Sequence, residues 1–579
     1  MSSDKPGTAE RQAKLGPEEH EENWRRLGEE EFDVVVVGGG ITGAGVALDA
    51  ATRGLRVALV EARDLAAGTS SRSSKLFHGG LRYLEQLEFS LVREALHERE
   101  LMLNRLAPHL VKPVSFLYPL THRFWERPYT AAGLLLYDRM GGARSVPGQK
   151  HLTRAGAQRM VPALKRDAMI GAVRYYDAQA DDARHTMTVA RTAARYGAVV
   201  RTSTQVVDFV HEADRIAGAR LRDVEDGRET EVRAKSVINA TGVWTDELQR
   251  LSGGRGHFRV RASKGVHVVV PRDRIVADSG MILRTEKSVL FVIPWGNHWI
   301  IGTTDTDWYL DLAHPAATKK DIDYILDHVN TVLATPLQHS DIEGVYAGLR
   351  PLLAGENDDT SKLSREHAVA RVAPGMIAIA GGKYTTYRVM AKDAVDAVSN
   401  DVSGRMASSI TDRVPLLGAD GYHALVNQAD QLAAAHGLHP YRVRHLLDRY
   451  GSMVHEVLAL CDENPELLKP IDDAPNYLKA EVVYAVRNEA ALHLEDVLTR
   501  RTRISFEYPH RGVDCADQVA RLIGAELGWD EQRITSEVEK YSERVRAERE
   551  SQDQPDDQAA DATRGTAPEV RDELVESVG

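Results

Sequence analysis

The chain has 579 residues, of which 43% are hydrophobic and 27% are charged, and its formal net charge is −12. Because single cores rarely grow beyond about 250 to 300 residues, two or more domains are expected. The acidic balance disfavours nucleic acid as a partner. No run of about 18 apolar residues is present, which argues against an integral membrane protein.

The two ends of the chain are polar, acidic and poor in aromatic residues. Such segments bury too little apolar area to offset their ordering entropy, so residues 1–31 are expected to be an N-terminal tail and residues 549–579 a disordered tail. The first 31 residues have neither the apolar centre of a secretory signal nor the acid-poor composition of a transit peptide, which predicts a cytoplasmic protein. Cys461 and Cys515 show no metal-binding or redox spacing, and no metal site is predicted.

The first element in chain order is DVVVVGGGITGAGVALDAATRGLRVALVE, residues 33–61. A buried strand runs into a GxGxxG loop that opens a helix, and a second strand ends at Glu61. Glycines of this spacing permit a tight turn, close approach of a pyrophosphate, and close packing of helix on strand, while the terminal acid can accept hydrogen bonds from a ribose. The loop residues predicted to bind the dinucleotide are Gly38, Gly39, Gly40, Ile41, Thr42 and Gly43.

Two later junctions decide which dinucleotide is expected. Residues 236–248 form a strand that breaks at Thr241 and Gly242, and residues 376–398 form a strand that reaches Gly381 and Gly382 before a helix. Several stretches of bare backbone suit a long ligand such as FAD better than a single NAD site. The sequence therefore predicts FAD, bound by segments far apart in the chain, and disfavours an NAD-linked dehydrogenase.

Residues 69–110, TSSRSSKLFHGGLRYLEQLEFSLVREALHERELMLNRLAPHL, closely resemble FAD-dependent glycerol-3-phosphate dehydrogenases of the D-amino-acid-oxidase-like flavoprotein superfamily. The resemblance recurs in YYDAQADDARHTM (175–187), KGVHVVVPR (264–272), VLFVIPWGNHWIIGTTDTD (289–307), YAGLRPLL (346–353) and GGKYTTYRVMA (381–391). It implies oxidation of sn-glycerol 3-phosphate to dihydroxyacetone phosphate, with hydride transfer from C2 to N5 of FAD and electron transfer to a membrane quinone. Family analogy also implies a homodimer, and any membrane attachment is expected to be peripheral, on the cytoplasmic face.

The same resemblance implies the residues around the substrate. The motif positions that match are Arg82, Tyr83, Arg350, Arg365 and Lys383. A guanidinium suits a phosphate through its planar fork of donors. Ser71, Ser73, Ser74, Lys75 and Thr385 are expected to line the FAD.

His78, in the loop LFHGG, is the proposed base, since an imidazole can take the hydroxyl proton near neutral pH. Lys383 or an arginine could instead polarise the alcohol while water removes the proton. Arg350 and Lys383 are accordingly counted with His78 as catalytic candidates. Arg500, Arg501 and Arg503 are expected on a solvated helix face, with capping of the active site or docking of a partner as the alternative.

The predicted fold class is α/β (α+β), with a Rossmann-like FAD domain, an interleaved antiparallel-sheet substrate domain and a C-terminal helical domain. The FAD domain is expected at 32–110, 190–255 and 345–405, the substrate domain at 111–189 and 256–344, and the helical domain at 406–548. Residues 291–305, FVIPWGNHWIIGTTD, read as a hairpin of the substrate sheet. An oxidase that passes electrons to oxygen remains an alternative, as does, from another class, a non-catalytic FAD-binding protein.

Overall fold

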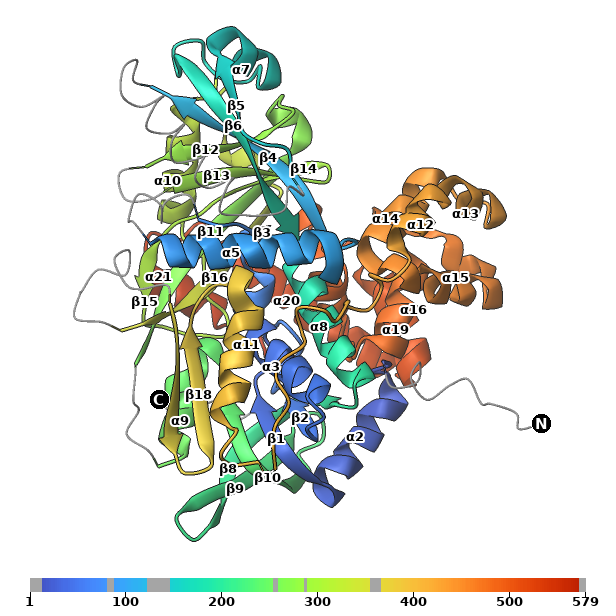
Figure 1. The fold of residues 1–579 in the computed structure, drawn as a ribbon. Coiled ribbons are helices and arrows are strands. Elements are labelled where there is room, and N and C mark those ends of the chain that lie inside the picture. Colours follow the sequence, from blue (N-terminus) through green and yellow to red (C-terminus); the bar gives the residue numbers. More distant parts are fainter. Residues whose placement is uncertain are drawn as a thin grey trace.

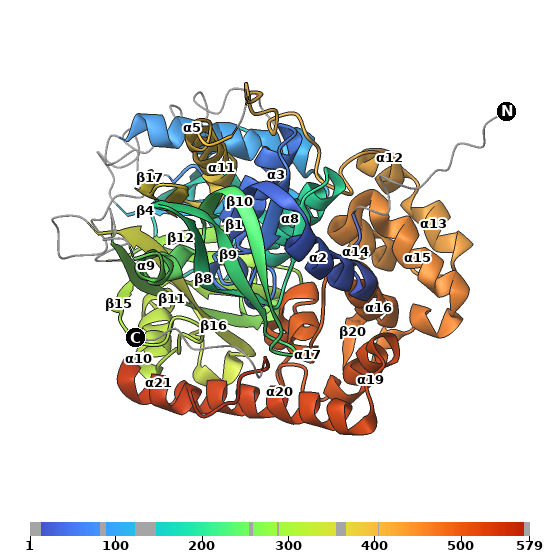
Figure 2. The ribbon, with the colours of Figure 1, turned by 90° about the horizontal axis from the view of Figure 1, so that it is seen from below.

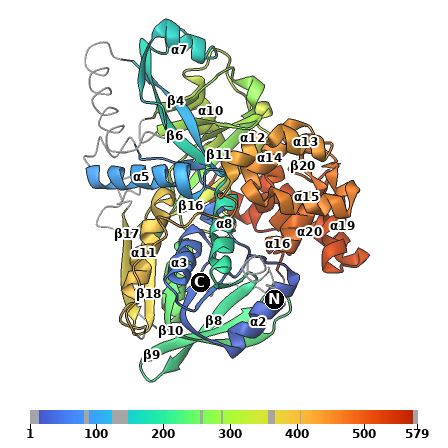
Figure 3. The ribbon, with the colours of Figure 1, turned by 45° about the vertical axis from the view of Figure 1, so that its right-hand side comes forward.

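The computed structural model describes residues 13–80, 88–121, 146–253, 259–285, 289–354, 366–402 and 404–571. Figure 1 shows three parts, with a largely antiparallel sheet at the top, a mainly parallel sheet below it, and a helical C-terminal part at one side. Helix α5 (Phe89–Leu101) lies across the junction of the two sheets, as Figures 1 and 3 show. The predicted division into α/β, antiparallel and helical parts is confirmed.

The parallel sheet has the strand order β17-β18-β10-β1-β2-β7, with the hairpin of β8 and β9 joined to β10. Its strands β18, β10, β1, β2 and β7 run parallel, and β17 is an antiparallel edge. Parallel strands covered on both faces read as continuous apolar runs, which explains the four valines of β1. The bounds are β1 Glu31–Val37, β2 Val57–Val60, β7 Val199–Arg201, β8 Thr204–Glu212, β9 Arg215–Asp223, β10 Glu229–Asn239, β17 His367–Ala373 and β18 Met376–Gly381.

Helices cover this sheet and aim its loops at one edge. Helix α3 (Ile41–Thr52) packs between α8 (Asp182–Arg195) and α11 (Tyr387–Ala397) on one face, and Figure 2 shows these helices gathered beside β1 and β10. Helix α2 (Pro17–Glu29) packs against β10 and β7. Helix α9 (Thr245–Leu251) follows β10 after one short helical turn. The carboxyl ends of β1 and β18 also lead into helical structure, at α3 and at the turn before α11.

The antiparallel sheet has the order β15-β11-β14-β13-β12-β4-β6-β3, with β16 paired to β11 and β5 to β6. One pair, β12 with β4, is parallel. The hairpin expected within 291–305 is present as β13 and β14. Helix α10 (Lys319–Asn330) covers the core on one face of the sheet, and α7 (Arg154–Met160) follows β5. The bounds are β3 Leu76–Phe77, β4 Val111–Leu120, β5 Lys150–Thr153, β6 Gly171–Ala180, β11 Val260–Pro271, β12 Gly280–Arg284, β13 Val289–Trp295, β14 His298–Gly302, β15 Thr306–Trp308 and β16 Gly344–Leu353.

The C-terminal part holds two helical cores and a two-stranded ribbon. Its last helices leave this part and return along the outside of the antiparallel sheet (Figure 2). The bounds are α12 Tyr422–Asn427, α13 Ala429–Ala435, α14 Pro440–Tyr450, α15 Val454–Glu463, β19 Pro470–Ile471, β20 Ala474–Leu478, α16 Lys479–Asn488, α17 Leu494–Asp496, α18 Ile504–Glu507, α19 Ala516–Leu527, α20 Glu531–Ser551 and α21 Asp557–Arg564. Within the described ranges, no helix is both long and apolar enough to cross a bilayer.

The prediction of two tails is wrong for the residues that the structure describes. In the N-terminal segment, α2 buries Leu27 and Asn23, whose side-chain amide donates to the carbonyl of Val200 at 3.0 Å. In the C-terminal segment, α20 continues to Ser551 and α21 follows. The composition argument counts apolar burial, whereas these segments are held largely by hydrogen bonds and ion pairs to the rest of the chain. Residues 1–12 and 572–579 lie outside the described residues.

Three predicted domain boundaries are also displaced. Strand β16 belongs to the antiparallel sheet, although its residues were assigned to the FAD domain from position 345 onward. The short strand β3 pairs with β6 of the same sheet. Helix α8, assigned in part to the substrate domain, packs on α3 beside the parallel sheet. Composition and strand pattern alone do not show to which part each of these elements belongs.

Candidate functional site

A cavity of about 1360 Å³, called here the large cavity, extends from the carboxyl ends of the parallel strands to the antiparallel sheet. Ligands of open α/β sheets bind outside the carboxyl ends of the strands, so this is the expected position. Most of the predicted cofactor-binding residues line it: Gly38, Gly40, Ile41, Thr42, Glu61, Ser73, Ser74, Thr241, Gly242, Gly381, Gly382 and Thr385.

The three glycines of the first loop have different surroundings. Gly38 has a φ of +110°, and a Cβ on it would lie 2.7 Å from the carbonyl oxygen of Ala240. A Cβ on Gly43 would lie only 1.8 Å from the carbonyl oxygen of Gly38, so this glycine allows the helix to pack on the loop. A Cβ on Gly40 would meet only the Ser70 hydroxyl, at 3.2 Å. Gly40 is therefore the glycine that keeps space for a ligand rather than for the protein.

Glu61 has a contact that the sequence did not predict. Its carboxylate accepts the backbone N–H groups of Gly39 at 2.6 Å and Arg63 at 2.8 Å. Burial raises the pKa of Glu61 above its ordinary value, while these two hydrogen bonds favour the carboxylate. The residue thus fixes the glycine loop and also lines the large cavity. Gly39 and Gly43 belong to the glycine loop but do not line the large cavity.

The substrate candidates that the structure describes lie in the same cavity. Arg350 extends from β16, and its guanidinium donates to the Thr303 hydroxyl at 3.0 Å and the Thr304 carbonyl at 3.2 Å. Its guanidinium also lies 3.5 Å from Asp305 and packs on bare Gly265. Lys383 and His78 line the cavity as well. Arg82, Tyr83 and Arg365 lie outside the described residues.

The His78 loop is joined to the junction at the end of β18. The backbone N–H of His78 donates to the Thr385 hydroxyl at 3.2 Å. That hydroxyl lies 3.3 Å from the His78 carbonyl oxygen, to which it can donate in turn. This contact joins residues that are 307 positions apart. It joins the loop that carries His78 to the turn that carries Lys383, two positions before Thr385, and both residues line the large cavity.

His267 on β11 lines the cavity, and sequence reasoning did not single it out although it lies in a quoted motif. Its ring stacks on Tyr346 with centroids 4.8 Å apart, and its Nε2 lies 2.9 Å from the Ser74 hydroxyl. Burial, with the charges of Arg350 and Lys75, holds the pKa of His267 well below 6.5. Its Nδ1 is buried and has no hydrogen-bond partner in the described part of the chain. A neutral imidazole with an open ring nitrogen fits a wall that meets a polar ligand.

Lys75 and Ser71 are not among the residues that line the large cavity. The Lys75 ammonium donates to Asp182 at 2.8 Å and to the carbonyl of Ser71 at 3.1 Å. It also lies 5.1 Å from the ring centroid of Tyr346, where a cation–π contact is favourable. A buried ammonium requires a carboxylate partner. The partner of Lys75 is Asp182, and this ion pair orients the ammonium away from the large cavity.

The arginine run near residue 500 is buried, which corrects the expectation of a solvated face. Arg501 donates to both carboxylate oxygens of Asp64, at 2.7 and 2.6 Å. Arg500 contacts Asp64 and Asp496, and Arg503 pairs with the acids at the start of α8. These ion pairs join the C-terminal part to the loops that flank the large cavity.

The segment 552–571, called here the C-terminal strap, forms another wall of the large cavity. The strap residues that line it are Arg564, Gly565, Ala567, Glu569 and Arg571. Glu569 lies 3.5 Å from Arg63 and also contacts His314. Asp557, at the start of α21, contacts Lys264 of β11. No sequence motif marks this wall, because the residues that the strap contacts lie far away along the chain.

The observed loops fit a dinucleotide, and family comparisons agree with that fit. Residues 33–392 match the family model described as FAD dependent oxidoreductase. The chain belongs to the FAD-dependent oxidoreductases. Residues 409–534 match the model described as the C-terminal domain of alpha-glycerophosphate oxidase. The predicted cofactor, FAD, and the predicted enzyme class are therefore confirmed.

Individual relatives of this FAD-dependent oxidoreductase extend over nearly its whole length. It is 69% identical over 564 residues to a protein named glycerol-3-phosphate dehydrogenase from Mycobacterium leprae, covering 97% of this chain and 96% of that protein. It is 36% identical to the mitochondrial glycerol-3-phosphate dehydrogenase of Homo sapiens, covering 88% and 72%. The solved glycerol-3-phosphate dehydrogenase from Bacillus halodurans complexed with FAD superimposes with a TM-score of 0.77 at 28% identity, covering 92% and 98%. The family resemblance drawn from the motifs is thereby confirmed.

Proposed function

We propose that this enzyme oxidises sn-glycerol 3-phosphate to dihydroxyacetone phosphate and passes the electrons to a quinone. The observation that carries the proposal is that Arg350, Lys383 and His78 line the same cavity as the dinucleotide loops. A cationic clamp, a proton acceptor and a cofactor site are what oxidation of a phosphorylated alcohol requires. The relatives named glycerol-3-phosphate dehydrogenase support the choice of substrate.

FAD would be held by the first glycine loop, Glu61, the serines after β2, and the turns at Thr241 and Gly381. When bound, FAD supplies the hydride acceptor for C2 of the substrate. The protein supplies position and electrostatics. Gly40 is the N-cap of α3, and a Cβ at this position would meet only the Ser70 hydroxyl, so a pyrophosphate has room to approach the positive end of the helix dipole.

Arg350 is proposed to bind the substrate phosphate. Hydrogen bonds from its guanidinium to Thr303 and Thr304 fix the side chain before any ligand arrives, which lowers the entropy cost of binding. Arg82, Arg365 and Tyr83 are proposed to complete the clamp. The Asp305 carboxylate orients Arg350 but also neutralises part of its charge.

His78 is proposed to take the proton of the C2 hydroxyl, and Lys383 to polarise the same oxygen. The hydrogen bonds between His78 and Thr385 hold the two groups in adjoining turns. A neutral imidazole is required for this step, so the rate should rise as His78 loses its proton. If water removes the proton instead, Lys383 alone carries the activation of the alcohol.

The electron acceptor has two candidates. Relatives named glycerol-3-phosphate dehydrogenase, such as those from Mycobacterium leprae and Homo sapiens, favour a dehydrogenase, for which we propose a quinone as the acceptor. The match of residues 409–534 to the C-terminal domain of alpha-glycerophosphate oxidase supports oxygen as the second candidate. A homodimer in the cytoplasm with peripheral membrane attachment completes the proposal, and the dimer rests on the family resemblance alone.

An anaerobic half-reaction tests both the proposed substrate and the proposed electron acceptor. Glycerol 3-phosphate is added to the purified holoenzyme without oxygen, and bleaching of the flavin absorbance reports the first half. The bleached enzyme is then mixed with a soluble quinone analogue or with oxygen. Bleaching followed by fast recovery with the quinone and slow recovery with oxygen is expected. Absence of bleaching would reject the substrate, and fast recovery with oxygen would favour the oxidase.

A further inference from the structure

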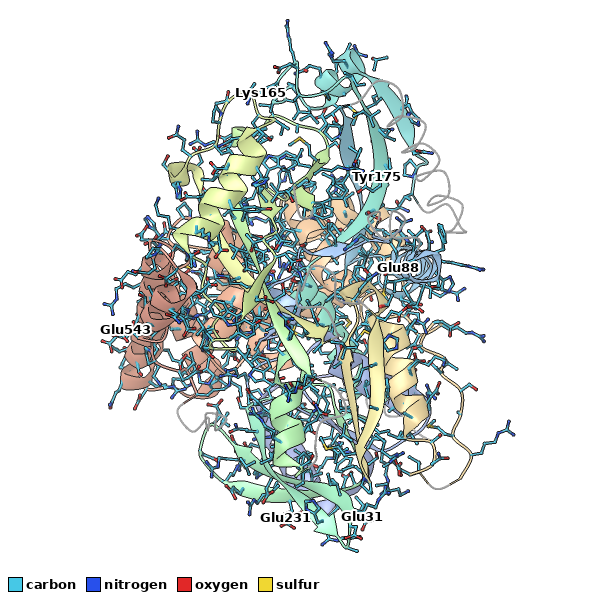
Figure 4. All side chains as sticks on the ribbon, turned by 90° about the vertical axis from the view of Figure 1, so that its left-hand side faces the viewer. Glu31, Glu88, Lys165, Tyr175, Glu231 and Glu543 are labelled. Carbon is cyan, nitrogen blue, oxygen red and sulfur yellow. The ribbon has the colours of Figure 1, made fainter. Side chains whose placement is uncertain are left out.

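A second cavity, of about 80 Å³, lies between helix α20 and strand β16 and is called here the arginine cavity. At roughly 10 to 15 Å³ per water, it has room for about five waters or for one compact anion. The α20 residues on the cavity wall recur every three or four positions and so share one helix face: Tyr541, Arg544, Val545, Glu548 and Ser551. The strap residue Gln552 follows them on the wall. In Figure 4, α20 runs along the outside of the molecule, with Glu543 marking its exposed side.

Four arginines of the cavity share few carboxylates. Among the described residues that line it, Glu548 is the single acid. Arg511 lies 2.6 Å from this carboxylate, and Arg544 and Arg564 each lie 3.3 Å from it. Arg544 also contacts Glu495, which Arg500 shares. The guanidinium of Arg72 donates to the carbonyl oxygen of Ala313 at 2.9 Å.

The two other arginines of the cavity wall already have acids of their own. Arg500 pairs with Asp64 and Asp496, and Arg503 pairs with the two aspartates that open α8. Of the four remaining guanidinium groups, those of Arg511, Arg544 and Arg564 share Glu548, and Arg544 also contacts Glu495, so that both carboxylates raise the pKa of Arg544. The Glu569 carboxylate acts on Arg564 as well. No ion pair to a carboxylate is found for Arg72 within the described residues. Burial lowers the pKa of Arg72 to about 10, and the neighbouring positive charge of Arg544 contributes. Burial likewise lowers the pKa of Arg511 and of Arg564.

Buried positive charges that outnumber the carboxylates they share are costly, because the interior solvates them poorly. A guanidinium fork matches the oxygens of a phosphate, and several forks around one small space match a tetrahedral ion. Polar groups of Ser505 and Gln552 also line the cavity, whereas the hydroxyls of Thr499 and Ser551 donate to the carbonyl oxygens of Glu495 and Glu548. We propose that the arginine cavity binds a tetrahedral oxyanion of the phosphate class. This site is distinct from the substrate clamp, although Arg72 and Arg564 line both cavities.

Such an anion would join three separate parts of the chain. Arg72 follows the cofactor loop, Arg544 lies on α20, and Arg564 lies in the C-terminal strap. The bound ion would neutralise their repulsion and hold the strap against the large cavity. The test must therefore count bound phosphate at this position and not only at the proposed substrate clamp.

Equilibrium dialysis of the holoenzyme with labelled inorganic phosphate separates the two positions. Comparison of the wild type with Arg350→Ala tests the substrate clamp. Comparison of Arg350→Ala with Arg350→Ala/Arg544→Gln tests the arginine cavity. One equivalent of phosphate per chain should remain in the first variant and be lost in the second. No bound phosphate in Arg350→Ala, or equal binding in the two variants, would overturn the proposal.

A gain-of-stability variant covers the case in which Arg544→Gln fails to fold. Gln552→Glu places a carboxylate on the cavity wall, where it should replace the ion. Thermal unfolding is followed in sodium chloride and in sodium phosphate of equal ionic strength. The wild type should gain stability from phosphate, whereas Gln552→Glu should begin more stable and gain less.

The matched control is Arg521→Gln, on the exposed face of α19, where Arg521 pairs with Asp517 and Glu531. It should respond to phosphate as the wild type does. General exclusion of phosphate from protein surfaces affects all three proteins equally, so the difference between them reports the site. Equal phosphate responses of the wild type and Gln552→Glu would refute the assignment.

Discussion

The guanidinium of Arg571 donates to the carboxylate of Asp496 at 3.1 Å, deep in the molecule and close to the chain end. The same guanidinium donates to the Ser203 hydroxyl at 2.9 Å. Ser203 follows β7 of the parallel sheet, whereas Asp496 belongs to the helical part. Arg571 therefore fastens the C-terminal strap to two parts of the chain, over a cavity that the strap itself lines.

We predict that a chain ending at Ser551 binds FAD more weakly. Loss of the strap opens one wall of the large cavity and leaves Asp496 and Arg63 without their strap partners. If the wall contributes one charged hydrogen bond of about 1.5 to 3 kcal/mol, the Kd for FAD should rise roughly tenfold to a hundredfold. Flavin fluorescence after serial dilution measures the change. Arg571→Ala should show a smaller loss, and Arg521→Ala, on the exposed surface, should show none. Full flavin retention by the truncated chain would contradict the role of the strap.

Substitutions at two glycines of the first loop should have different outcomes. Gly40→Val should give a folded but colourless protein, because its Cβ meets only the Ser70 hydroxyl at 3.2 Å while the side chain enters the space for the pyrophosphate. Gly43→Val should fail to fold normally, because its Cβ would lie 1.8 Å from the Gly38 carbonyl oxygen. Circular dichroism and the ratio of flavin to protein absorbance separate the two outcomes. Stoichiometric flavin in Gly40→Val would show that the loop does not carry the pyrophosphate.

Replacement of Arg350 should weaken catalysis selectively for the phosphorylated substrate. Arg350→Ala should lose a charge-assisted interaction of about 1.5 to 3 kcal/mol, which is a tenfold to few-hundredfold fall in kcat/KM for glycerol 3-phosphate. Plain glycerol should lose far less, and Arg350→Lys should recover part of the loss. Equal proportional losses on both substrates would place Arg350 in a structural role through Asp305 and Thr303. A normal flavin spectrum of each variant is the control for damage to the cofactor site.

His493 should make stability fall as the pH rises above neutrality. Its ring nitrogens lie 2.9 Å from Glu537 and 3.0 Å from Glu225. Although burial opposes the charged form, the Glu225 carboxylate raises the pKa of His493 to about 9. Because this folded pKa lies above the unfolded value of 6.5, the contribution is complete below pH 6.5 and is lost as the pH rises to about 9.

Between these two pKa values, the His493 contribution to the free energy of unfolding should fall by about 1.4 kcal/mol per pH unit, the value for one proton. Thermal unfolding of the wild type and of His493→Gln between pH 6 and 9.5 measures it. The wild type should be the more stable protein at pH 6, and the difference should shrink toward pH 9. A difference that does not change with pH would mean that His493 is neutral in the folded protein.

Local sequence determined the dinucleotide loop and the fold class. The strand, glycine loop and helix of residues 33–52 depend on neighbours a few positions apart, so the residue spacing alone predicts their shape. The hairpin of β13 and β14 was predicted for the same reason. The presence of His78, Arg350 and Lys383 in one cavity followed from family motifs, and the structure brings them together.

Tertiary structure decided which residues close the site. Arg501 and Asp64 are 437 positions apart, and Arg571 and Asp496 are 75 apart. No local pattern records such pairs, so a buried arginine run read as a solvated face and an acidic chain end read as a tail. The composition rule for disorder weighs apolar area, whereas the strap is held mainly by charges whose partners lie on other elements. Lys75 likewise lies away from the large cavity because of a distant partner: its ammonium pairs with the Asp182 carboxylate on α8.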